Sequence, residues 1–132
     1  MNPQKFRART RTFALRIIRL SESLPNTPTA HAIRNQLLRS GTSVGANYRA
    51  ACRAKSRRDF IAKLGIVEEE ADETSYWIEL LIDTGLINRG RVVDLLQEAD
   101  EILAMVVSSI RTAKNLQADS KSAIRNQQSA IL

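Results

Sequence analysis

The sequence is poor in several kinds of residue. Its 132 residues include one cysteine, one histidine, three prolines and five glycines. A single cysteine, Cys52, excludes an intrachain disulfide framework and is typical of a reducing compartment, so we expect a cytoplasmic protein. No apolar run approaches the roughly 20 residues of a membrane-spanning helix, and we expect no membrane contact. So few glycines and prolines argue against a β-sandwich or barrel, because such folds need many turns.

Charge is present in quantity but is unevenly distributed. With 43% apolar and 26% charged residues and a formal net charge of +6, the composition is that of one ordinary globular domain. Residues 1–58 contain thirteen basic residues and one acidic residue, whereas residues 59–113 contain twelve acidic and four basic ones. Either the two halves neutralise each other in the fold, or the basic half faces a polyanion.

Apolar periodicity predicts four helices, at about residues 3–24, 28–54, 57–84 and 89–115. The joints are short, so consecutive helices should be antiparallel neighbours in an all-α, up-down-up-down four-helix bundle that spans residues 1–115. From residue 116 the periodicity stops, and residues 116–132 are predicted to be a polar tail that is frayed or disordered. The first three helices have predicted caps: Asn2 before Pro3, Thr27 before Pro28, and Ser56, whose amide Asp59 can reach back to bond.

Two of the helices carry more apolar residues than one core needs. In residues 57–84 the predicted inward stripe is Phe60, Leu64, Val67, Ala71, Ser75, Ile78 and Ile82. Other apolar residues of this helix and of the first lie off the stripes and are predicted to form a subunit interface: Leu15, Ile18, Ile66, Trp77 and Leu81. We therefore expect a homo-oligomer; a wide ordinary core is the alternative.

The second helix contains two glycines, Gly41 and Gly45. Each costs about 1 kcal/mol in a helix relative to alanine, so a compensating contact is expected. Small side chains allow a second helix to approach closely, and Ser43 or Asn47 could then form a hydrogen bond across that contact. A phosphate-binding glycine loop is disfavoured, because no strand precedes the segment and no Gly-Lys-Ser/Thr sequence ends it.

The sequence offers little for catalysis or metal binding. The densest acidic cluster, residues 68–73, contains no Glu-x-x-His motif, and the only histidine, His31, lies near the start of the second helix. Cys52 lies among alanines, which favours a buried structural thiol over a nucleophile. We therefore expect no enzyme activity, no metal and no cofactor.

Basic residues remain as candidates for binding a nucleic-acid backbone. Arginine suits this role because its planar guanidinium can bind a phosphate through two hydrogen bonds. The candidates are Arg9, Arg16, Arg19, Arg39, Arg49, Arg53, Lys55, Arg57 and Arg58. In the alternative interpretation these arginines pair with the acids at residues 68–73, and the protein is an interaction scaffold that binds no nucleic acid.

Three runs of sequence carry a family resemblance: QLLRSGTSVGANY at 36–48, DFIAKL at 59–64 and EEEADE at 68–73. They resemble the four-helix-bundle family of intervening-sequence proteins, which are encoded within bacterial large-subunit ribosomal RNA genes. The resemblance implies a homopentameric barrel. It extends to the accessory protein of diversity-generating retroelements, a basic pentamer that binds nucleic acid and works with a reverse transcriptase, so RNA, DNA and such an enzyme are implied partners. It implies no catalytic residue.

Overall fold

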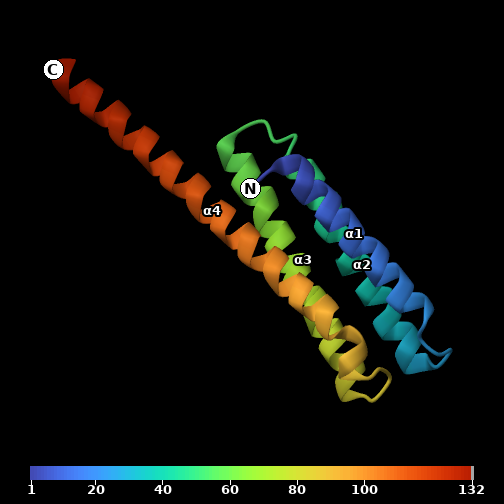
Figure 1. The fold of residues 1–132 in the computed structure, drawn as a ribbon. Helices are drawn as coiled ribbons and strands as arrows, with labels where there is room; N and C mark the ends of the chain where they lie inside the picture. Colours follow the sequence, from blue (N-terminus) through green and yellow to red (C-terminus); the bar gives the residue numbers. More distant parts are fainter. Residues whose placement is uncertain (132) are drawn as a thin grey trace.

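The computed structural model describes residues 1–131, with side chains for residues 1–127. These residues form four helices and no strand: α1 (Pro3–Glu22), α2 (Pro28–Ala51), α3 (Arg57–Asp83) and α4 (Arg89–Ile131). Consecutive helices run antiparallel and lie side by side (Figure 1). The predicted four-helix bundle is thereby confirmed. None of the helices in the described part of the chain is long and apolar enough to cross a membrane.

The caps form as the sequence predicts, with one change of partner. The side chains of Asn2, Thr27 and Ser56 each accept a hydrogen bond from the amide three residues later, at 3.1, 3.2 and 3.0 Å. The Asp59 carboxylate, however, accepts from the amide of Lys55 at 3.2 Å, not from that of Ser56.

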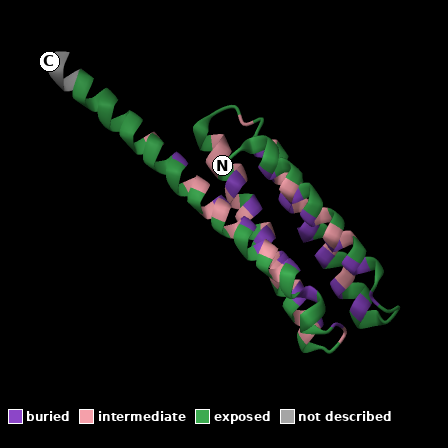
Figure 2. Ribbon diagram, in the orientation of Figure 1, coloured by how far each residue is buried: buried purple, intermediate pink, exposed green. Residues whose placement is uncertain are grey.

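The buried residues of α3 follow a strict alternation of three-residue and four-residue steps. In α3 the fully buried residues are Leu64, Val67, Ala71, Thr74, Ile78 and Leu81. The predicted stripe is therefore wrong at its C-terminal end, where Ser75 and Ile82 are only half-buried. The reason is that one heptad pattern continues along the whole helix and places Thr74 inward despite its hydroxyl group. Figure 2 shows the buried residues on the inner sides of the helices.

A buried polar contact joins α2 to α3. The hydroxyl groups of Ser40 and Thr74 lie 3.0 Å apart and share a hydrogen bond, and Thr74 also lies 2.7 Å from the carbonyl oxygen of Glu70. Both side chains are completely buried. The sequence reasoning missed this pair, although both residues fall at heptad positions that face the core.

The close approach of α1 to α2 occurs at Gly41. A Cβ atom added there would lie 2.6 Å from Cγ2 of Ile17, so only glycine fits. The predicted bonds across this contact do not form. Ser43 donates to the carbonyl of Arg39 and Asn47 to that of Ser43, both within α2, because the helix offers these acceptors one turn away.

The last helix is longer than predicted. It does not end near residue 115 but continues to Ile131 and projects past the bundle (Figure 1). After Gly90 the sequence contains no glycine or proline, and six of residues 117–127 are alanine, glutamine, lysine or arginine, which favour helix without any tertiary contact. Lack of apolar periodicity predicts lack of packing, not lack of helix. We call residues 114–131 the α4 extension.

Candidate nucleic-acid interface

Arg9 is neutralised where α1 meets α4. Its guanidinium binds the Glu98 carboxylate through two hydrogen bonds, Nη2–Oε1 at 2.7 Å and Nε–Oε2 at 2.8 Å. Glu101 adds a contact at 3.3 Å. The hydrogen bond to Glu98 raises the pKa of Arg9, which keeps it charged. This candidate phosphate ligand is therefore occupied by the protein's own carboxylates.

Arg39 is neutralised where α2 meets α3. It donates to both oxygens of Glu70, at 3.2 Å each, and to Oε1 of Glu73. The Trp77 indole donates to the same Glu73 oxygen at 3.2 Å. The Arg39 hydrogen bond holds the pKa of Glu73 below its ordinary value. The predicted pairing with residues 68–73 thus occurs at this one arginine.

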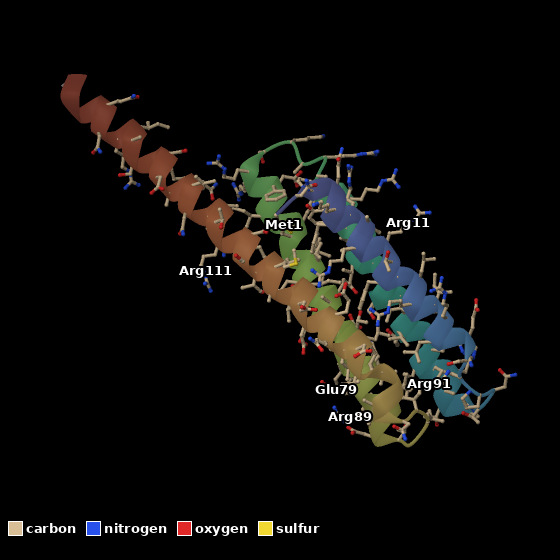
Figure 3. All side chains as sticks on the ribbon, viewed as in Figure 1. Met1, Arg11, Glu79, Arg89, Arg91 and Arg111 are labelled. Atoms are coloured by element: carbon tan, nitrogen blue, oxygen red, sulfur yellow. The ribbon has the colours of Figure 1, made fainter. Side chains whose placement is uncertain are left out.

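Three arginines line a groove where α1 packs on α2. Arg7, Arg11 and Arg49 surround a hollow of about 490 Å³. Small residues make up the rest of its lining: Ala8, Thr10, Ala14, Thr42, Gly45 and Ala46. No carboxylate lines this groove, and none of the three arginines makes an ion pair within residues 1–127. Figure 3 shows Arg11 pointing away from α1. We call this groove the basic seam.

The same end of the bundle carries four more of the predicted residues. Arg53 and Lys55 follow α2, and Arg57 and Arg58 open α3; all four are exposed. The nearby acid Asp59 is already bound by Lys63, whose Nζ lies 2.9 Å from its carboxylate. This hydrogen bond, together with that from Lys55, lowers the pKa of Asp59.

Arg16 and Arg19 lie elsewhere, on the side of α1 that faces α4. With Arg91 they line a smaller hollow of about 250 Å³, which contains no carboxylate. The nine predicted residues therefore do not form one surface. Two are ion-paired, two lie in this hollow, and five lie at the basic seam or at the adjoining end of the bundle.

Sequence reasoning missed Arg7, Arg11 and Arg91. A signal for the first two was present, because Arg7 and Arg11 are one helical turn apart and share a face. A matching face of α2 carries small residues together with one arginine: Thr42, Gly45, Ala46 and Arg49. The two faces can be paired only if the angle by which each helix is rotated about its own axis is known. The apolar stripes determine that angle only approximately.

The predicted subunit interface is partly exposed. Leu15 and Ile66 are 44% and 41% exposed, and Ile18 and Trp77 are half-buried. Leu81 is a correction: it is completely buried in the bundle core, at the end of the α3 heptad pattern, and cannot contact another subunit. The exposed Tyr76, which was not predicted, packs edge-on against Trp77 with ring centroids 5.0 Å apart.

Cys52 is also a correction. It caps the C-terminus of α2 and is exposed, because the bundle opens into a cavity at this end. His31 is exposed, with its Nε2 3.4 Å from the Asn35 amide nitrogen. Within the described residues no three His, Cys, Asp or Glu side chains group closely enough to hold a metal ion.

Comparison with known proteins agrees with the resemblance carried by residues 36–48 and confirms it. The profile of the 23S rRNA-intervening sequence protein family matches residues 4–108. The fold is similar to the crystal structure of a protein of unknown function from the S23 ribosomal protein family of Bacteroides thetaiotaomicron. The two have a TM-score of 0.78 and 41% identity, over 84% of this chain and 99% of that chain. No curated protein matches. The chain belongs to the 23S rRNA-intervening sequence protein family.

Proposed function

We propose that this chain is a non-enzymatic protein that binds the sugar-phosphate backbone of RNA or DNA at the basic seam. The observation that carries the proposal is the absence of any carboxylate around Arg7, Arg11 and Arg49, in a groove lined otherwise by small side chains. Small residues allow a backbone to approach, and the three guanidinium groups can each bind a phosphate.

The chemistry of the seam favours contact with phosphates over reading of bases. Its lining contains no aromatic side chain on which a base could stack. Binding should therefore depend on counterion release, vary little with sequence and weaken steeply with salt. The family description names 23S rRNA, so a fragment of that RNA is the first ligand to test.

We propose further that the chain self-associates, as the homopentamer implied by the resemblance. The exposed Leu15 and Ile66, with the half-buried Ile18 and Trp77, support a contact between the α1 side of one copy and the α3 side of the next. A ring would repeat the basic seam and strengthen binding by avidity, without a strong single site.

The experiment compares two triple variants with equal loss of charge. The first variant, Arg7→Ala/Arg11→Ala/Arg49→Ala, removes the three positive charges of the basic seam. The second, Arg16→Ala/Arg19→Ala/Arg91→Ala, removes the three positive charges of the other hollow. Each lost phosphate contact should reduce the slope of log K against log salt by about 0.7 for single-stranded and 0.9 for duplex ligands. We expect a loss of about 2 to 3 in slope for the first variant and little for the second. Equal losses for both would contradict a localised site.

An interaction scaffold is the second candidate, and the ion pairs of Arg9 and Arg39 favour it. They show that part of the basic half is used for internal neutralisation. If the unaltered chain fails to bind an RNA fragment at low salt, the scaffold interpretation is preferred. Pull-down with other proteins would then be the appropriate assay.

A further inference from the structure

An apolar cavity opens at the end of the bundle where α4 leaves it. Its volume is about 1030 Å³. Apolar residues from all four helices line it, among them Pro3 of α1, Ala51 of α2, Phe60 of α3, and Met105 and Leu116 of α4. The cavity lies between the N-terminus of α1, the joint that connects α2 to α3, and α4. We call it the end cavity.

The α4 extension has an apolar face without a partner. Leu116 and Ile124 are 50% and 55% exposed. Ile124 follows Ala113, and Ala113 follows Ile102, at intervals of eleven residues, or about three helical turns, so the three share one face. Ile102 and Ala113 are buried in the bundle. The inward face of α4 therefore continues past the bundle into solvent.

The sequence of the extension supports a helical partner. Ser-Ala-Ile occurs at residues 122–124 and again at 129–131, a spacing of seven residues. A seven-residue repeat keeps identical residues on one face and is typical of helices that pair with other helices. The basic residues Lys114, Lys121 and Arg125 lie on a separate flank, so pairing through the apolar face leaves them in solvent.

We propose that the occupant of the end cavity is the α4 extension of a second copy, in a two-fold, antiparallel arrangement. The extension is about 27 Å long, and the α4 wall of the cavity, residues 104–116, about 20 Å. A helix about 10 Å across would fill the cavity volume with about nine residues. A two-fold axis near residue 118 lays residues 120–131 of each copy along residues 105–116 of the other.

This arrangement closes on itself, because the same contact covers both end cavities and leaves no free extension. It brings Ile124 of one copy over the α4 wall of the other, near Thr112. It uses neither the basic seam nor the faces that carry Leu15 and Ile66, so it goes beyond the function proposed above. Rings and extension pairs can coexist in one assembly.

The experiment uses the full chain and two substitutions two residues apart. Ile124→Asp introduces a charge on the apolar face, and Ser122→Asp introduces the same charge on the opposite side of the helix. Both side chains are exposed, so neither substitution disturbs the bundle core. Light scattering should show that Ile124→Asp halves the mass of the assembly, whereas Ser122→Asp leaves it unchanged.

Cys52 provides a second readout, because it lines the end cavity and is the only cysteine. A thiol reagent should label it several-fold more slowly in the paired form, so that the rate falls as the unaltered chain is concentrated. In Ile124→Asp the rate should not depend on concentration. An unchanged mass for Ile124→Asp, or concentration-independent labelling of the unaltered chain, would overturn the proposal.

Discussion

The seam between α1 and α4 differs from the seam between α1 and α2, although one helix supplies arginines to both. Arg9 faces α4 and is bound by Glu98 and Glu101. Arg7 and Arg11 face α2, where they meet Arg49 and no carboxylate. The α2–α3 seam is like the first, with Arg39 bound by carboxylates of α3.

The difference follows from the order of charge along the chain. The basic half folds into α1 and α2, and the acidic half into α3 and most of α4. Seams between the halves bring opposite charges together at Arg9 and at Arg39, although three arginines at another point of the α1–α4 seam meet no carboxylate: Arg16, Arg19 and Arg91. The seam inside the basic half brings only like charges together. A charge count over the whole chain hides this, since only the position of a residue around its helix decides which seam it joins.

The largest change is expected where a neutralised seam is made basic. Glu98→Lys places a second positive charge against Arg9, in a pair of which Glu98 is only 18% exposed. Because a partly buried pair is replaced by a repulsion, we expect a loss of about 2–4 kcal/mol in the free energy of unfolding. Urea denaturation measures it. The matched control is Glu101→Lys, 55% exposed, which should cost about 1 kcal/mol or less.

A smaller loss is expected from separating α1 and α2. Gly41→Ala puts a methyl group against the buried side chain of Ile17, and the overpacking should cost about 1–3 kcal/mol. Gly65→Ala, on the exposed side of α3, meets no atom within 4 Å and should instead stabilise by up to about 1 kcal/mol. Thermal melts of the two variants should shift in opposite directions; parallel shifts would contradict the close contact.

The basic seam can be made like the neutralised ones by adding an acid. Ala46→Glu places a carboxylate in the groove beside the three arginines. We expect a gain of about 0.2–1 kcal/mol in stability from a new surface ion pair. Binding of the RNA fragment should fall at the same time. Ala46→Gln, nearly equal in size and uncharged, separates charge from bulk: a similar loss of binding would indicate obstruction of the groove.

The smallest effect concerns pH at the α2–α3 seam. Arg39 lowers the pKa of Glu73 in the folded state, whereas the unfolded value is about 4.3. The unfolded chain therefore binds the proton first as pH falls, and the stability from this carboxylate, present above about pH 4.3, is lost as pH falls through the folded pKa. Glu73→Gln should make the urea midpoint less dependent on pH between 5 and 3. Glu69→Gln, which removes an exposed carboxylate, is the control.

The fold could be predicted because its signals are local. A cap such as Asn2 before Pro3 and the apolar periods specify where helices begin and which way they face. The prediction places Leu81 at the subunit interface and omits Thr74 from the stripe, because an apolar stripe two or three residues wide can be drawn in two ways. Ser75 and Ile82 fit the other one. Only packing against the neighbouring helices α2 and α4 distinguishes them.

The candidate site was harder to predict, because it depends on pairs of residues far apart in the sequence. Arg9 and Arg39 look like Arg49 in sequence, and what separates them is the presence of Glu98 or Glu70 across a seam. Arg7 carries the same charge, yet the sequence prediction does not include it in the site. Helix rotation, not composition, decides which arginines remain available to a ligand.

The 43-residue α4 also determines how the molecule moves through water. This helix is about 65 Å long. A compact globular chain of 132 residues, in contrast, has a radius of gyration of only about 14 Å. A projecting rod raises friction without adding mass. The protein should elute early from a gel-filtration column even as a single copy, so its elution volume alone would overstate the number of subunits.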